Sequence, residues 1–135
     1  MAKSNALVLS RMINRTDAIP RGTLLFRSEI YSGTNLKTSR RKIDFTSTTI
    51  ELNSALEYLG TIVHRETIDP VLVVWIYHVT NTKLKGIYAN AYRFDKNAHE
   101  KEILLQRNIK VTETKRSEGS YRGAKILVIN ADISG

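Results

Sequence analysis

The sequence predicts an α+β domain built around a largely antiparallel β-sheet. The chain has 135 residues, a length typical of one domain. Hydrophobic residues make up 41% of it and charged residues 25%, the composition of an ordinary globular protein. Six or seven short runs have the composition of strands, against one modest helical layer. We therefore expect one domain over residues 1–135.

The amino-terminal third alternates short regular elements with turns. Apolar residues between positions 5 and 13 are compatible with a short helix. A turn at 20–22 precedes a β-prone run at 23–26, and a second short strand is expected at 43–47. The polar stretch 32–41 between them contains a glycine and is expected to be a loop.

A second helix is predicted over residues 52–63, where the apolar residues recur at helical spacing. Thr48 and Glu51 stand three residues apart at its entrance. This spacing is that of a capping box, in which each side chain bonds a backbone amide of the first turn.

The carboxyl-terminal half is rich in strand signals. Residues 71–79 form a nearly continuous apolar run, which is typical of a central strand buried on both faces. His78 and Trp75 lie on this run, so both are expected to be core residues. The charged, glycine-containing segment 113–122 is expected to be a surface hairpin loop. Further strands are predicted at 86–91, 101–106, 109–114 and 124–130.

Composition excludes several classes of protein. Cysteine is absent, which rules out disulfides and thiolate metal sites, and the three histidines lack the close spacing of a zinc motif. No apolar stretch approaches the roughly 20 residues of a membrane span. We expect a soluble protein of the cytoplasm, without a metal.

The formal net charge of +8 should attract anions. Nucleic acid, an acidic protein and the phosphates of a cofactor all fit this description. The basic residues are dispersed, and the tightest cluster is Arg40, Arg41 and Lys42. Dedicated nucleic-acid binders usually concentrate their basic residues and place stacking aromatics among them.

Three local patterns could carry chemistry. Glu100 and Glu102 open an apolar run and, in a strand, would lie on the same side. Two neighbouring carboxylates disfavour simultaneous ionisation, so their environments can divide two roles between them. Ser47 and Thr48 belong to a run of hydroxyls that can cap a helix or orient a carboxylate. Arg27 ends an apolar strand and is suited to hold a phosphate.

Each pattern alone is more common in structural settings. An isolated E-x-E usually belongs to a solvated edge, threonine-rich strands are frequent, and an arginine often ends a strand at the surface. Their order along the chain is more specific, because an arginine strand is followed by a Ser-Thr-Thr strand, a helix, an apolar strand and then E-x-E.

This order resembles the arginine–STS–ExE group of mono-ADP-ribosyltransferases. That group includes vertebrate ecto-enzymes, binary bacterial toxins and phage-encoded transferases. The resemblance extends over residues 19–133. It implies a single catalytic domain with a split, mostly antiparallel β core and few short helices.

The resemblance also implies NAD⁺ as a substrate and a role for each matching residue. Arg27 would hold a phosphate of NAD⁺, and Ser47 would hydrogen-bond Glu102. Glu102 would bind the ribose hydroxyls and stabilise the oxocarbenium-like centre formed as nicotinamide leaves. Glu100 would sit beside the acceptor and accept its hydrogen bonds or its proton.

Two further residues are placed at the cofactor by the same resemblance. Ser28 stands where the group usually has a glycine whose backbone contacts nicotinamide. Thr48 is the second residue of the hydroxyl motif, which ends in Thr49 where the group usually has serine. Tyr31 and Tyr58 are both candidates to stack on nicotinamide.

In this group a carboxylate at the position of Glu100 is associated with arginine as the acceptor. The expected activity is therefore transfer of ADP-ribose to a protein arginine, a glycosyltransferase reaction, by a toxin-like, viral or phage effector. Its target could belong to an acidic or nucleic-acid-associated complex of the host cytoplasm. The alternatives are a nucleic-acid acceptor, hydrolysis of NAD⁺, or a non-enzymatic basic protein that binds nucleic acid or is structural.

Overall fold

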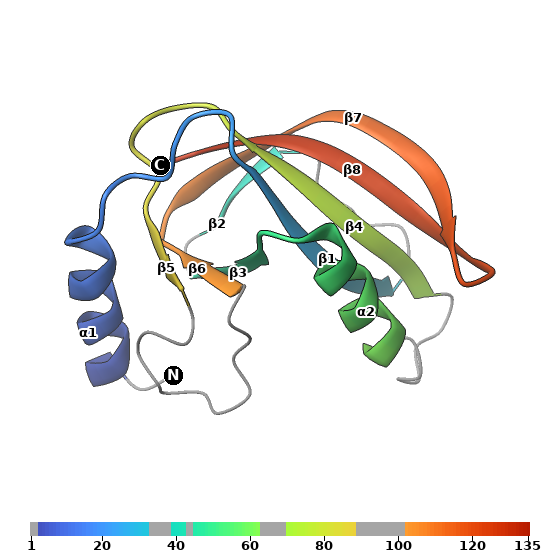
Figure 1. Ribbon diagram of the computed structural model, residues 1–135, viewed down its shortest axis with the longest axis horizontal. Helices are drawn as coiled ribbons and strands as arrows, with labels where there is room; N and C mark the ends of the chain where they lie inside the picture. The colour runs from blue at the N-terminus through green and yellow to red at the C-terminus, as the bar shows by residue number, and fades with distance from the viewer. Residues whose placement is uncertain (1–2, 33–38, 43–44, 63–69, 89–101) are drawn as a thin grey trace.

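A computed structural model describes residues 3–32, 39–42, 45–62, 70–88 and 102–135. Within these ranges the chain forms one curved sheet and two helices (Figure 1). Helix α1 lies beside β5 at one end, and α2 packs against β1. Neither of these helices is long and apolar enough to cross a bilayer.

The sheet has eight strands in the order β2-β7-β8-β4-β1-β3-β6-β5. Its pairings are antiparallel, except that β4 and β8 run parallel. This confirms the expected α+β class with a mostly antiparallel sheet. The elements are α1 (Lys3–Asn14), β1 (Leu24–Ser32), β2 (Ser39–Lys42), β3 (Thr46–Thr49), α2 (Leu52–Ile62), β4 (Pro70–Val79), β5 (Gly86–Tyr88), β6 (Glu102–Leu105), β7 (Ile109–Tyr121) and β8 (Ala124–Ser134).

Strand β4 is central and buried on both faces, as its apolar run predicted. The side chains on one face of β4 enter the main core, where Trp75 stacks on Tyr77 with ring centroids 5.7 Å apart. On the opposite face of β4, Leu72 and Val74 pack beneath α2 against Leu59. The sheet thus separates two apolar layers.

Both helices are held by apolar residues spaced four apart. Leu9 and Ile13 of α1 cover Ile87 and Leu104 at the end of the sheet. In α2 the corresponding residues are Ala55 and Leu59, both almost fully buried. The helices therefore fix opposite parts of the sheet.

The loop expected at 32–41 is wrong where the structure describes it. Residues 39–42 form β2, which pairs with Ile109–Thr112 of β7. This strand is polar in sequence and arises because β7 offers it a free edge, a long-range contact that local composition does not encode. Positions 33–38 of the expected loop lie outside the described residues.

The surface loop expected at 113–122 is also wrong. Strand β7 continues to Tyr121 and pairs with β8 as far as Ala124. Only Arg122 and Gly123 turn, with φ of 50° and 78°, the left-handed values of a two-residue hairpin turn. The charges of this segment reflect a solvated two-stranded ribbon.

The other predicted elements are present with shifted ends. The strand expected at 23–26 extends to Ser32, and that at 124–130 extends to Ser134. Positions 43–44, 63, 89–91 and 101 of expected strands and helix lie outside the described residues.

Candidate active site

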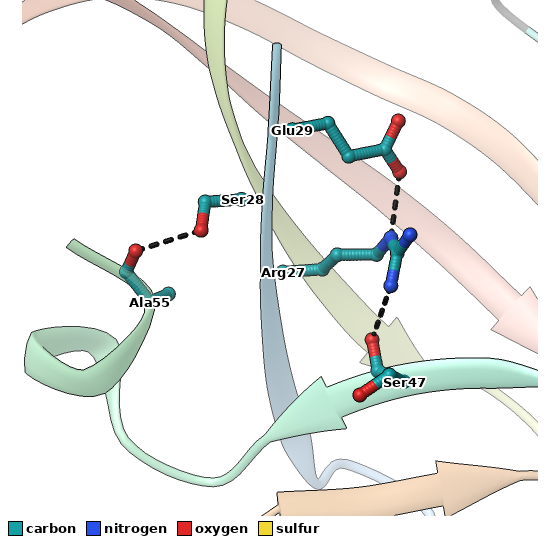
Figure 2. Close-up of polar contacts among 5 residues, drawn as sticks. All are labelled: Arg27, Ser28, Glu29, Ser47 and Ala55. Atoms are coloured by element: carbon teal, nitrogen blue, oxygen red, sulfur yellow. Dashed lines mark hydrogen bonds and ion pairs between the residues drawn. The ribbon is translucent and has the colours of Figure 1, made fainter. Parts of the chain in front are cut away.

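Arg27 projects from β1 toward β3 and is held at two of its nitrogens. Its Nε donates to Oε1 of Glu29 at 2.7 Å, and its Nη1 donates to the backbone carbonyl of Ser47 at 2.8 Å (Figure 2). The Arg27 side chain is 31% exposed and that of Glu29 is 15% exposed. The guanidinium is thus oriented by the protein and still reachable from solvent.

Ser47 connects this arginine to a carboxylate on the next strand. β3 lies between β1 and β6 in the sheet. The Ser47 carbonyl accepts from Arg27, whereas its hydroxyl donates to Oε1 of Glu102, the first residue of β6. Glu102 is partly buried. Three residues distant along the chain therefore meet at one place.

The expected hydrogen bond between Ser47 and Glu102 is therefore present. A carboxylate that accepts from a fixed hydroxyl keeps one orientation, and its remaining lone pairs can accept hydrogen bonds from sugar hydroxyls. A guanidinium nearby suits a phosphate. Together they can bind a phosphorylated ribose and stabilise positive charge developing on the sugar.

Ser28 points away from Arg27, because successive side chains of a strand alternate between its two faces (Figure 2). Its hydroxyl is buried and donates to the backbone carbonyl of Ala55 in α2 at 2.7 Å. The side chain thus ties α2 to β1. Ser28 can reach a cofactor on the Arg27 side only through its backbone.

Thr48 is buried, and its hydroxyl donates to the carbonyl of Ile103 in β6 at 2.8 Å. The capping box expected from Thr48 and Glu51 is wrong, because Thr48 lies within β3 and α2 begins only at Leu52. At the entrance the amide of Glu51 instead donates to Oγ1 of Thr49. The Thr48 side chain joins the two strands that carry Ser47 and Glu102.

Glu100 lies outside the described residues, so its proposed place beside the acceptor stays a prediction. Glu102, two positions later, is the member of the E-x-E pair that the structure describes.

Glu29 is the site residue that sequence reasoning missed. Arg27 and Glu29 form an R-x-E pattern in a strand, and alternation alone places two such residues on the same side. That signal was available in the sequence. It is hard to distinguish from the ordinary charge pairs that occur along many strands.

Of the remaining candidates, Trp75 is registered opposite Arg27 in the β1–β4 ladder, and the side chain of Tyr31 lies outside what the structure describes. Trp75 is 1% exposed and is a core residue as expected, whereas His78 is only partly buried and shares a 2.9 Å hydrogen bond with Oδ1 of Asn130. The Tyr58 side chain is half exposed on α2. Within the described residues no three histidine, aspartate or glutamate side chains gather as metal ligands would.

Comparison with solved structures identifies the fold. Vis toxin, an ADP-ribosyltransferase from Vibrio splendidus, superposes with a TM-score of 0.70 at 14% identity, over 97% of this chain and 56% of that one. C3larvin toxin from Paenibacillus larvae gives a TM-score of 0.59 at 15% identity, over 98% and 70%. The toxin BECa of a C. perfringens binary enterotoxin, solved with NADH, gives 0.61 at 13%, over 98% and 36%.

The chain thus has the ADP-ribosyltransferase fold, which confirms the expected fold. It spans just over half the length of Vis toxin. No protein-family model matches the sequence, and no curated protein matches it closely. At these identities the likeness is one of fold.

Proposed function

We propose that this protein transfers ADP-ribose from NAD⁺ to an acceptor and releases nicotinamide. One observation carries the proposal: the Ser47 hydroxyl donates to Glu102 while the Ser47 carbonyl holds Arg27. These residues occupy the motif positions of the resemblance noted in the sequence, on a fold shared with transferases of that class.

In the proposed reaction Arg27 binds a phosphate of NAD⁺, and Glu102 accepts hydrogen bonds from the hydroxyls of the nicotinamide ribose. The bond between C1′ and the nicotinamide nitrogen breaks, and its electron pair leaves with nicotinamide, which becomes neutral. Positive charge then develops on the ribose, where the oriented carboxylate of Glu102 stabilises it. The acceptor nitrogen bonds to C1′ and loses a proton, which Glu100 receives.

We propose a protein arginine as the acceptor. Support comes from the carboxylate two residues before Glu102, the position linked with arginine acceptors in the resembling group. One Vis toxin structure contains agmatine, an arginine analogue. We further propose the host cytoplasm as the place of action and an acidic or nucleic-acid-associated complex as the target, which the net charge of +8 would favour.

The first test compares the parent with Glu102→Ala and Glu102→Gln in a cell lysate containing labelled NAD⁺. Both variants should lose label transfer by about a hundredfold or more, the usual effect of removing an electrostatic stabiliser. Glu113→Ala is the matched control, because Glu113 is a carboxylate of low exposure paired with an arginine in the β7–β8 ribbon. It should transfer label like the parent.

The test also addresses the alternative of a basic nucleic-acid-binding protein, which the net charge favours. If the parent transfers no label while parent and Glu102→Ala bind nucleic acid equally and in a salt-sensitive manner, the enzymatic proposal is wrong. Label recovered on nucleic acid instead of protein would reassign the acceptor and keep the reaction.

A second prediction separates the two carboxylates. Glu100→Gln should abolish transfer to agmatine and to protein while NAD⁺ hydrolysis continues, because water needs less help from a base at that position than a guanidinium does. Nicotinamide release measured with and without agmatine distinguishes the two reactions. Parallel loss of both would contradict the division of roles.

A further inference from the structure

The carboxylate of Glu29 has no role in the proposed reaction, yet it directly contacts the arginine of the site. It lies two residues after Arg27 on the same side of β1 (Figure 2). The contact is a 2.7 Å charge-assisted hydrogen bond to Nε, and the glutamate is the less exposed partner. Such bonds are short and directional, so they fix the plane of a guanidinium as well as its distance.

The orientation of this guanidinium matters because β1 and β3 are only weakly paired with each other. Within the described residues the ladder joining these strands has a single registered pair, Phe26 with Thr49. By contrast, β1 and β4 are in register along the whole of β1. The hydrogen bond from Nη1 of Arg27 to the Ser47 carbonyl therefore adds a second connection between these two weakly paired strands.

This hydrogen bond ends on Ser47, the residue whose hydroxyl orients Glu102. When the Ser47 carbonyl is held, the backbone of β3 is fixed at the point from which the hydroxyl donates to Oε1 of Glu102. A continuous path then runs from the Glu29 carboxylate through the guanidinium and the Ser47 peptide to the Glu102 carboxylate. Errors of about 1 Å in such placement can cost a hundredfold in rate.

We propose that Glu29 is a positioning residue, which locks Arg27 onto the Ser47 carbonyl and thereby sets the placement of Glu102. The inference rests on the proposed function for its kinetic consequence. It predicts that Glu29 governs turnover more than affinity for NAD⁺. Removing the glutamate loosens the site but leaves the positive charge of Arg27 available to the phosphate and takes away the Glu29 carboxylate that competes for it.

The chain contains a matched control pair. Glu113 also accepts a short bond from the Nε of an arginine, that of Arg116 at 2.8 Å, and is 14% exposed against 15% for Glu29. Arg116 itself is 37% exposed, close to the 31% of Arg27. The two pairs therefore have similar distances and burial, but only one of them touches the Ser47 carbonyl.

The test measures NAD⁺ hydrolysis and equilibrium NAD⁺ binding for the parent, Glu29→Ala, Glu29→Gln and Glu113→Ala. Glu29→Ala should lower kcat about ten- to a hundredfold, with KM and the dissociation constant for NAD⁺ unchanged or lower. Glu29→Gln keeps an acceptor for Nε–H and should lie between Glu29→Ala and the parent. Glu113→Ala should stay within about twofold of the parent for both constants, whatever its effect on thermal stability.

A readout independent of activity follows the Thr48 amide by NMR, because this amide shares a peptide group with the Ser47 carbonyl. Its proton shift should move in both Glu29 variants and not in Glu113→Ala. Equal kcat for Glu29→Ala and Glu113→Ala, or a raised KM with unchanged kcat, would overturn the inference. An unmoved Thr48 amide would overturn it too. A parent that neither binds nor hydrolyses NAD⁺ would instead overturn the proposed function. The proton shift of the Thr48 amide would still decide whether Glu29 helps to hold β3 against β1.

Discussion

At the scale of single residues, β3 gives neighbouring hydroxyls different surroundings. The partly exposed Ser47 donates to Glu102, whereas Thr46 and Thr48 are 2% and 3% exposed. Thr48 donates to the Ile103 carbonyl, but Oγ1 of Thr46 has no hydrogen-bond partner among the residues that the structure describes. A buried hydroxyl without a partner opposes folding, and a paired one favours it.

This difference predicts opposite effects for two chemically identical substitutions. Thr→Val keeps the shape of the side chain and removes the hydroxyl. Thr48→Val should lower the free energy of unfolding by about 1 kcal/mol, and Thr46→Val should leave it unchanged or raise it by up to about 1 kcal/mol. Urea unfolding with equal m-values measures both. Equal destabilisation by the two would mean that Thr46 has a bonding partner after all.

At the scale of elements, local patterns predicted the strands and helices whose own residues carry the signal. The apolar run of β4 and the helical spacing of α2 are examples. β2 was missed because its four polar residues become a strand only through pairing with β7. The outer half of β7 was missed because a solvated ribbon has the same composition as a loop.

The same distinction between sequence patterns and long-range contacts applies to the site. The proximity of Arg27, Ser47 and Glu102 was predictable because their order along the chain resembles a known motif, whereas their roles in catalysis stay a prediction. Glu29 was not singled out, since R-x-E has no such specificity. The routes of individual hydrogen bonds could not be predicted, as Thr48 illustrates: its partner lies on β6 and not at the start of α2.

At the scale of the whole molecule, the formal net charge of +8 is the property with a functional consequence that no single residue carries. Such a field raises the local concentration of anionic macromolecules and accelerates their encounter with the protein. Its reach is set by salt, because the Debye length is about 10 Å at 0.1 M and about 3 Å at 1 M. Chemistry inside the site depends much less on ionic strength.

The net charge therefore predicts a salt-dependent preference between acceptor peptides that each contain a single arginine. Two peptides of equal length, one flanked by glutamates and one by lysines, would compete for transfer in the presence of saturating NAD⁺. At about 0.05 M salt the glutamate-flanked peptide should be favoured by about tenfold in kcat/KM, and at about 0.5 M the two should converge. Nicotinamide release without peptide should change less than about twofold over this range. A preference that persists at high salt would locate selectivity in short-range contacts at the acceptor position, and an absent preference at low salt would mean that the net charge does not select the acceptor.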